Sequence, residues 1–334
     1  MRFLIITPAA VGSTKGNRIT AERWARIITT LGHQVSIRES FDGKSPNTNS
    51  SARKKPPFDV LVALHAAKSN PSVVRFRKKF PASKIVVAFT GTDIHLKPNA
   101  PRSLVNRIVQ SLKLADQVVL LQPESMRLIS KSARHKTSVI FQSSKPIATP
   151  PKKLTRWFEV SVIGHLRPVK DPFRTALAAR QLPPNSRVRI VHFGAALIDE
   201  MKKTAEKEQR TNPRYRWLGQ VTHSEAKRRL SRSRLTVLSS KSEGGPAVIS
   251  EAIVNDVPIL TTRINATIGL LGKGFPGFFE FGNTKQLADL IHRAESDKEF
   301  YQSLVKEGKK RKRQFSPAAE KKSWATLIKA LGNG

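Results

Sequence analysis

The sequence contains no cysteine and no long apolar run, and each absence excludes a class of protein. Without cysteine there is no disulfide, no thiolate metal site, no iron–sulfur cluster and no cysteine nucleophile. A secreted disulfide scaffold is therefore excluded, and a reducing compartment fits. No stretch approaches the roughly 20 apolar residues that a membrane-spanning helix needs, so no transmembrane segment is predicted.

The first residues do not resemble a cleaved signal. Only Arg2 precedes their short apolar core, and a polar glycine loop follows directly. This pattern suits a first buried strand better than a signal peptide. We therefore expect a cytoplasmic protein.

Acidic residues are scarce. The chain has 24 Asp and Glu against 60 Lys and Arg, a net charge of +36. Such a field favours anionic partners, namely nucleic acid, a membrane surface or phosphorylated small molecules. The excess is spread over both halves, and the densest runs, at residues 75–79, 227–234 and 309–313, are typical of solvated helix faces. A specific nucleic-acid partner is not expected, because its footprint would be more local and interleaved with aromatic residues.

The length predicts two domains. A single core rarely serves more than about 250–300 residues, and this chain has 334. Apolar residues make up 39% and charged residues 25%, which is typical of a folded globular chain. Short apolar strands alternate with amphipathic helical stretches, a pattern that predicts parallel sheets covered on both faces.

We expect an α/β fold with two doubly wound, Rossmann-like domains facing a central cleft, where such folds bind ligands. Residues 1–150 form the first domain and 151–315 the second, with a proline-rich linker at 146–151. A last helix over 316–334 is expected to cross back to the first domain. The predicted strands are residues 3–7, 34–38, 60–64, 85–89, 117–121, 138–141, 158–163, 187–193, 214–218, 235–239 and 258–261.

The sharpest local signal is the segment SSKSEGGPAVISEA at residues 239–252. Gly244 and Gly245 allow close backbone approach, and Pro246 is suited to open a helix. Glu243 then lies on a loop and Glu251 about one turn into the helix. Carboxylates placed in this way can accept hydrogen bonds from sugar hydroxyls.

The segment GHLRPVKDP at residues 164–172 follows the first strand of the second domain. His165, Arg167 and Lys170 should therefore lie at the carboxyl end of that strand. A fixed cation there can neutralise the charge that grows on a departing phosphate. The chain has no Asp-x-Asp pair to hold a divalent cation for the same purpose, so we expect no metal.

Loops of the first domain supply further candidates. The loop at residues 12–18 can bring backbone N–H groups, Lys15 and Arg18 to an anion, or it can be a plain turn, since the Walker ending is missing. His65 follows another strand, and Asp93 lies in a segment that ends a third. A chemical role and a structural hydrogen bond are both open for these two side chains.

Other chemistries lack their motifs. The string GKGFPG at residues 272–277 matches a dinucleotide pattern, but Pro276 and the following residues do not open a helix after a strand. No histidine pair has metal-ligand spacing, and no serine lies in a G-x-S-x-G elbow. We expect no cofactor.

Together, the glycine loop, GHLRPVKDP and the two glutamates resemble the retaining GT-B glycosyltransferases that use nucleotide sugars. The resemblance implies that Lys170 contacts the donor diphosphate, Glu243 the sugar and Glu251 the ribose. Those enzymes usually have an arginine directly after the glycine, where this chain has His165, so Arg167 is a candidate for the second phosphate contact.

A closer similarity extends over residues 1–330. The strings TPAAVGSTKGNRITAERWARIITTLGH, VALHAAKS, GTDIH, GHLRPVKDP, NPRYRWLG, SEGGPAVISEA and IGLLG, in this order, look like the selenosugar synthases of selenoneine biosynthesis. That family joins a UDP-N-acetylhexosamine, UDP-GlcNAc or UDP-GalNAc, to selenophosphate, making a 1-seleno-sugar and releasing UDP and phosphate.

The resemblance implies two sets of contacts and makes Lys170 and Glu243 the catalytic residues. The residues implied for the donor are Gly12, His165, Arg167, Lys170, Glu243, Gly244, Gly245, Glu251, Gly269 and Leu270, the last two through backbone amides of the IGLLG loop. The residues implied for the acceptor are Lys15, Gly16, Asn17, Arg18, His65, Thr90, Gly91, Thr92 and Asp93.

The chemistry agrees with these residues. The soft selenium of selenophosphate needs no strong general base, whereas an alcohol acceptor would demand a catalytic His–Asp pair. The site must hold two anions together, and Lys15, Arg18 and Lys170 are candidates to offset their repulsion. Two alternatives stay open: a GT-B enzyme that acts on a hydroxyl acceptor, and a non-catalytic nucleic-acid-binding protein on a degenerate transferase fold.

Overall fold

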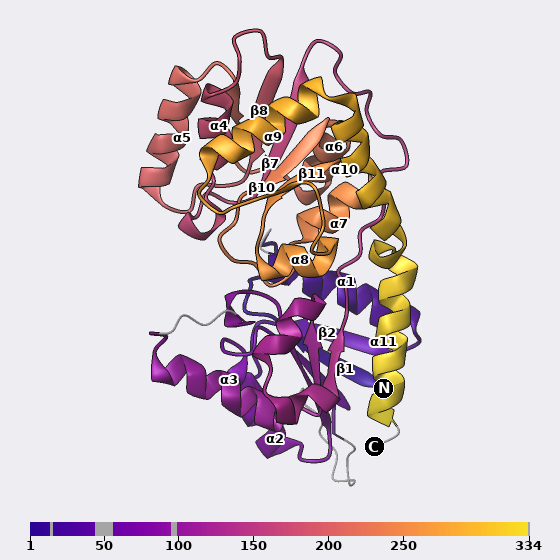
Figure 1. Cartoon of the computed structure of the whole chain (residues 1–334). Helices are drawn as coiled ribbons and strands as arrows, with labels where there is room; N and C mark the ends of the chain where they lie inside the picture. Colours follow the sequence, from indigo (N-terminus) through magenta and orange to yellow (C-terminus); the bar gives the residue numbers. More distant parts are fainter. Residues whose placement is uncertain (14–15, 44–55, 95–98, 333–334) are drawn as a thin grey trace. The chain divides into compact units, whose positions relative to one another are not determined.

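The computed structural model describes residues 1–13, 16–43, 56–94 and 99–332 and divides into two compact units (Figure 1). Unit 1 consists of Met1–Gln142 with Ala318–Gly334, and unit 2 of Ser143–Pro317. Each unit is built on one six-stranded sheet in which all paired strands are parallel. The prediction of an α/β fold with two Rossmann-like domains is confirmed.

The sheet of unit 1 has the strand order β2-β1-β3-β4-β5-β6. Its strands are β1 (Arg2–Ile6), β2 (Gln34–Arg38), β3 (Val60–Leu64), β4 (Lys84–Phe89), β5 (Gln117–Leu120) and β6 (Thr137–Val139). Its helices are α1 (Gly16–Thr30), α2 (Asn70–Lys79), α3 (Arg102–Leu114) and α11 (Pro317–Gly332), with short 3-10 turns η1 (Thr92–Ile94), η2 (Pro123–Leu128) and η3 (Lys131–Lys136).

Helices cover both faces of this sheet (Figure 1). Successive side chains of a strand point to opposite faces, so neighbouring residues of β1 enter different cores. Phe3 and Ile5 pack with α1 and α11, whereas Leu4 and Ile6 pack with α2 and α3. Burial on both faces explains why these strands read as continuous apolar runs in the sequence.

The chain ends in unit 1, where α11 docks on α1. Trp24 and Trp324 meet edge to face, with ring centroids 4.9 Å apart. Beside them the buried carboxylate of Glu320 accepts hydrogen bonds from Arg23 Nε at 3.0 Å and Trp24 Nε1 at 2.8 Å. A buried carboxylate is stable only when it is paired in this way. The last helix is therefore part of the core of unit 1.

The sheet of unit 2 has the strand order β12-β11-β10-β7-β8-β9. Its strands are β7 (Phe158–Ile163), β8 (Val188–Phe193), β9 (Tyr215–Trp217), β10 (Leu235–Leu238), β11 (Ile259–Thr262) and β12 (Phe278–Phe279). Its helices are α4 (Arg174–Arg180), α5 (Asp199–Thr211), α6 (His223–Arg232), α7 (Ala247–Val254), α8 (Asn265–Leu271), α9 (Thr284–Ser296) and α10 (Lys298–Arg311), with 3-10 turns η4 (Pro168–Lys170) and η5 (Lys312–Phe315).

The segment expected to be a linker, residues 146–151, lies in unit 2. The backbone N–H of Ile147 donates to Asn255 Oδ1 at 2.8 Å, and Asn255 directly follows α7. This hydrogen bond fixes the start of unit 2 to its own helices.

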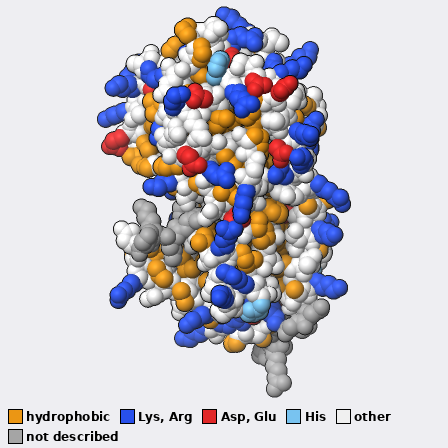
Figure 2. Space-filling model, viewed as in Figure 1, with side chains coloured by type: hydrophobic (Ala, Val, Ile, Leu, Met, Phe, Trp, Pro, Cys, Tyr) orange, Lys and Arg blue, Asp and Glu red, His pale blue; other side chains and the backbone are white. Residues whose placement is uncertain are grey.

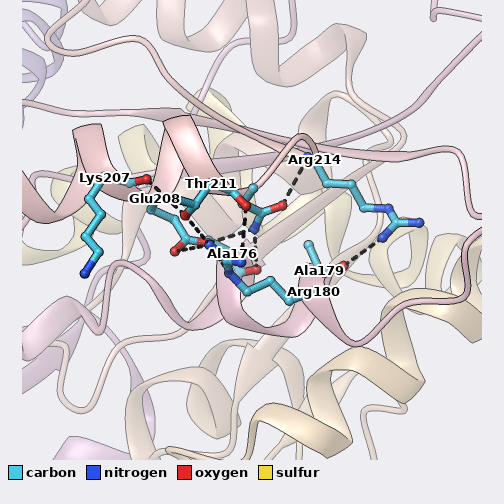
Figure 3. A network of polar contacts seen from close by, with 8 residues as sticks. Ala176, Ala179, Arg180, Lys207, Glu208, Thr211 and Arg214 are labelled. Carbon is cyan, nitrogen blue, oxygen red and sulfur yellow. Dashed lines mark hydrogen bonds and ion pairs between the residues drawn. The ribbon is translucent and has the colours of Figure 1, made fainter.

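A polar network holds α4, the helix that begins four residues after Lys170 (Figure 3). Arg180 donates to both carboxylate oxygens of Glu208 on α5, at 2.9 and 3.0 Å. Asn212 donates to the backbone oxygen of Ala176 at 3.0 Å and to Glu208 at 2.7 Å. These contacts join the end of α5 to α4 and so fix the helix behind the Lys170 loop.

Basic side chains are spread widely over each unit, as the face in Figure 2 shows. This agrees with the even distribution of charge along the sequence. Among the described residues, no helix is long and apolar enough to cross a membrane.

Candidate functional site

Two neighbouring strands of unit 2 place Lys170 and Glu243 in contact. Strand β10 pairs with β7, so the loops that follow them leave the same edge of the sheet. Lys170 ends η4 after β7, and Glu243 lies in the loop after β10. Lys170 Nζ is 2.5 Å from Glu243 Oε1, and the side chains are 28% and 11% exposed. The two residues for which the sequence predicts catalytic roles therefore form an ion pair.

Backbone contacts fix the Lys170 loop to the end of β10. Ser239 Oγ lies within hydrogen-bonding distance of the backbone oxygens of Lys170 and Asp171, at 3.1 and 2.9 Å. The backbone N–H of Lys241 donates to Val169 O at 2.8 Å. Asp171 takes a left-handed conformation with φ of 44°, and its carboxylate pairs with Arg174 of α4 at 2.7 Å. The loop is therefore held on both sides of Lys170.

The start of the loop that carries Lys170 packs against the loop that follows β8. Gly194 follows β8 with φ of 155°, and a Cβ there would lie 2.0 Å from the backbone oxygen of Gly164. Only glycine allows this approach of the two loops. His192 Nε2 lies 3.1 Å from the same Gly164 oxygen, and its Nδ1 lies 3.0 Å from the Tyr215 hydroxyl. Burial lowers the pKa of His192 to about 4, so the ring is neutral at pH 7 and can donate one N–H to Gly164.

The other two candidates on this loop differ in their surroundings. His165 Nδ1 accepts the backbone N–H of Ala195 at 3.1 Å, which places the hydrogen of the neutral ring on Nε2. Arg167 precedes η4 and is exposed. Its guanidinium has no ion pair with any carboxylate among the described residues, so it is an accessible cation on this loop.

Glu251 lies where the sequence predicts it, one turn into α7, and Pro246 directly precedes that helix. Its carboxylate is buried and in contact with a residue that sequence reasoning missed. His223 Nε2, at the start of α6, is 2.7 Å from Glu251 Oε1. The two residues are 28 positions apart, and no local pattern could have joined them.

Buried hydroxyl groups near Glu243 were also missed. The hydroxyls of Ser240, Ser242 and Thr261 are buried and have no hydrogen-bond partner among the described residues. Buried polar groups are normally paired, so the two serine hydroxyls in the Glu243 loop are groups that a ligand could satisfy. The run of serines directly after a predicted strand was the available signal. Gly244 is buried and Gly245 half-buried in the turn that follows.

The loop predicted at Gly269 and Leu270 is a helix in the structure. The segment IGLLG was expected to be a loop whose backbone amides bind a diphosphate. Both residues lie inside α8, which runs from Asn265 to Leu271. Amides beyond the first turn of a helix donate to carbonyl groups of the preceding turn, so these two are already used. The loop was implied by the resemblance to GT-B enzymes, but Leu270 and Leu271 are buried and hold the helix in place.

In unit 1, the predicted anion loop is partly helical. Gly16, Asn17 and Arg18 form the first turn of α1. Lys15, the side chain of Thr92 and residues 95–98 lie outside the described residues. Arg18 Nε donates to Glu22 at 2.7 Å, while its Nη1 is buried without a partner among the described residues. The hydroxyl of Thr90, after β4, is likewise buried without a partner among the described residues. Gly12, before the gap, is exposed with φ of 75°.

His65 and Asp93 are brought together at the carboxyl ends of β3 and β4. Asp93 accepts the backbone N–H of Ala66 at 2.7 Å and that of Gly91 at 2.9 Å, so it joins the two loops. His65 Nδ1 is 3.7 Å from Asp93 and accepts the Lys68 backbone N–H at 3.3 Å. Burial lowers the pKa of His65 and raises that of Asp93. The contact with Lys68 leaves the hydrogen of a neutral His65 ring on Nε2.

No cluster of three His, Asp or Glu side chains within the described ranges is placed to hold a metal ion.

Comparison with known proteins gives the relatives of this fold. Residues 150–311, a little under half of the chain, match the family model for glycosyl transferases group 1. Sucrose-phosphate synthase from Thermosynechococcus elongatus is similar in structure, with a TM-score of 0.77 and 15% identity over 99% of both chains.

Two further solved structures are similar over nearly the whole chain. Anabaena Alr3699/HepE in complex with UDP has a TM-score of 0.74 and 16% identity over 98% of this chain and 99% of its own. A glycosyltransferase from Rickettsia africae ESF-5 has a TM-score of 0.73 and 14% identity over 99% and 98%. At these identities the likeness shows the fold, which is that of the GT-B glycosyltransferases.

Proposed function

We propose that the chain is a glycosyltransferase that transfers an N-acetylhexosamine from UDP-GlcNAc or UDP-GalNAc to selenophosphate. Selenium attacks the anomeric carbon, the bond between that carbon and the UDP oxygen breaks, and UDP leaves with the bonding electrons. Water then cleaves the Se–P bond, giving phosphate and a 1-seleno-sugar. The observation that carries the proposal is the Lys170–Glu243 pair, held at the carboxyl edge of the sheet within the segment that matches glycosyl transferases group 1.

The donor side of the proposal rests on unit 2. The Lys170 ammonium group is fixed by its loop and can stabilise charge that develops on the departing diphosphate. Glu243 would receive the sugar hydroxyls and Glu251 the ribose. Arg167 and the hydroxyls of Ser240 and Ser242, which have no partner in the part of the chain that the structure describes, offer further donors to the phosphates. The likeness to a protein solved in complex with UDP supports this choice of nucleotide.

The acceptor side rests on unit 1. Selenophosphate is a small polyanion, and Nη1 of Arg18, buried and without a partner in the described part of the chain, is a donor suited to one of its oxygens. Nε2–H of His65 and the hydroxyl of Thr90 are donors at the carboxyl ends of β3 and β4. Lys15 completes this proposed set. These groups would bind the oxygens of the acceptor anion and leave its selenium without hydrogen bonds, so that selenium can act as the nucleophile.

We also propose that the reaction needs no divalent metal. The support is Lys170, which supplies a positive charge where a metal would otherwise act. Turnover should therefore persist after dialysis against EDTA, and restoration of lost turnover by added Mg²⁺ or Mn²⁺ would contradict this part.

The test mixes the purified full chain with UDP-GlcNAc or UDP-GalNAc and selenophosphate and measures UDP release. We expect UDP and a product with the mass of a selenium-containing sugar. A reaction without selenophosphate gives the background hydrolysis. No UDP above that background would contradict the proposal.

A second function is favoured by one observation. The buried contact between His65 and Asp93 is the arrangement that a hydroxyl acceptor would require for its deprotonation. It speaks for a GT-B enzyme acting on an alcohol. The hydrogen bond from the Lys68 N–H to Nδ1 of His65 argues against this alternative. It leaves the ring hydrogen on Nε2, so Nε2 has no lone pair to accept a proton from an alcohol. A sugar product without selenium, formed from an alcohol acceptor, would identify this alternative.

A further inference from the structure

We infer that His223 positions Glu251 and thereby sets a preference for ribose over deoxyribose in the nucleotide that this protein binds. The inference rests on the proposed function, in which Glu251 holds the ribose of UDP. It adds a residue to that site and a measurable selectivity.

The two side chains come from different helices of unit 2. His223 is the first residue of α6, whose start is capped by the Thr222 hydroxyl accepting the Glu225 N–H at 3.2 Å. Glu251 lies in the middle of α7. The side chain of Glu251 is 9% exposed and that of His223 is 42% exposed, and their polar atoms are 2.7 Å apart. A nearly buried carboxylate therefore meets one partly exposed ring.

The chemistry of the two groups fixes the direction of the hydrogen bond. An ionised carboxylate only accepts, so Nε2 of His223 must carry the hydrogen and donate to Oε1. Within the described ranges, Oε2 of Glu251 has no protein donor. The carboxylate is thus held in one orientation, with Oε2 left to accept from a ligand. A hydroxyl group satisfies such an oxygen, and a C–H group does not.

Discrimination follows from this geometry. A site built to bond a hydroxyl rejects an analogue that lacks it, because the buried acceptor is then left without a donor. Without His223, the carboxylate can turn to another rotamer or toward solvent, and the penalty for the missing hydroxyl falls. If His223 only joined α6 to α7, its removal would weaken binding of ribose and deoxyribose nucleotides by the same factor.

The experiment measures the affinity of the full chain for UDP and for 2′,3′-dideoxy-UDP by titration calorimetry. The wild-type protein should prefer UDP by about tenfold or more. His223→Ala should reduce this ratio at least threefold and leave the affinity for the dideoxy nucleotide close to wild type. His223→Gln retains an N–H donor and should restore most of the ratio. Ser224→Ala, at the adjacent exposed position, is the matched control and should keep the wild-type ratio.

Each outcome decides a different statement. If the wild-type protein binds UDP and His223→Ala keeps the full ratio, the role of His223 is wrong and the proposed function stands. Equal weakening of both nucleotides in His223→Ala would also reject the positioning role. If the wild-type protein binds no UDP, both the inference and the proposed function fail. Thermal unfolding of each variant separates loss of binding from loss of folding.

Discussion

Lys170 and Glu243 follow neighbouring strands of one sheet, and their side chains meet with 2.5 Å between Nζ and Oε1. Each carries the charge opposite to that of the other, and the ammonium group of Lys170 lies at the place proposed for the diphosphate. Removal of either side chain takes an oppositely charged partner from the other, which is largely buried. Variants of the two residues should therefore not act independently.

Lys170→Ala should lower kcat for UDP-sugar transfer by about 10²–10³-fold, the usual loss when one charge-stabilising donor is removed. The measurement is steady-state UDP release with both substrates saturating. Lys285→Ala, which removes an exposed lysine of the same unit, should leave kcat unchanged. Turnover of Lys170→Ala at the wild-type rate would refute the role of this residue. The double variant with Glu243→Ala should lose less than the product of the two single losses, because the residues act as a unit.

Gly194→Ala should destabilise unit 2 and disturb donor binding together. The new Cβ would lie 2.0 Å from the backbone oxygen of Gly164, at a φ of 155° that side chains rarely adopt. Displacement of these loops costs roughly 2–4 kcal/mol of unfolding free energy. Urea unfolding measures the loss, and a raised KM for UDP-sugar would show that it reaches the Lys170 loop. Gly274→Ala is the control, since no atom lies within 4 Å of its Cβ. Equal stability of the two variants would contradict this account.

The fold could be predicted because its signals are local. The buried strand VLVAL is predicted at residues 60–64 and forms β3 with the same bounds. Pro246 before an apolar helical stretch likewise indicated the start of α7. The strand is apolar at every position because both faces of its sheet are buried. The proline is favoured at the start of the helix because it lacks the N–H that would be unpaired there.

The parts that failed depend on contacts between distant residues. His223 contacts Glu251 because α6 packs beside α7. No local sequence pattern predicts that these two helices pack together. The resemblance implies a loop where the structure has α8, and the helix forms although glycine is a poor helix former, because Leu270 and Leu271 are buried. The two residues of β12 are too few for a periodic pattern.

Arg18→Ala should raise KM for selenophosphate and leave KM for UDP-sugar close to wild type. Its Nη1 is buried and has no partner within residues 1–13, 16–43, 56–94 and 99–332, and the proposed partner is an oxygen of the acceptor anion. Loss of a charge-assisted hydrogen bond predicts an increase of roughly tenfold to a hundredfold. Initial rates with each substrate varied in turn give both constants. Arg26→Ala, two turns along α1, is the control. A raised KM for UDP-sugar alone would contradict the assignment of Arg18 to the acceptor.

Acid should destabilise unit 2 through His192. Burial lowers the pKa of His192 from 6.5 to about 4, so between these values the unfolded chain binds a proton that the folded chain does not. Stability is therefore complete above about pH 6.5 and falls as the pH drops toward 4, by at most about 1.4 kcal/mol per pH unit. Unfolding free energies from urea titrations at pH 7.5, 6 and 5 should show a shallower fall for His192→Gln than for wild type. His292→Gln, at an exposed position, is the matched control. Parallel curves for wild type and His192→Gln would refute this source of acid sensitivity.

Glu320→Ala should release α11 from α1. The carboxylate is buried and accepts from both Arg23 and Trp24, so its removal leaves a guanidinium that is 14% exposed without its ionic partner and an indole N–H without an acceptor. Breaking a buried pair from one side costs about 3–5 kcal/mol of unfolding free energy. Glu320→Gln keeps an oxygen for Trp24 but loses the charge, so its loss should be intermediate, and Lys321→Ala, at the adjacent exposed position, should lose nothing measurable. Urea unfolding followed by circular dichroism ranks the three variants. A Glu320→Ala protein as stable as Lys321→Ala would mean that apolar packing, without the Glu320 carboxylate, holds the last helix on unit 1.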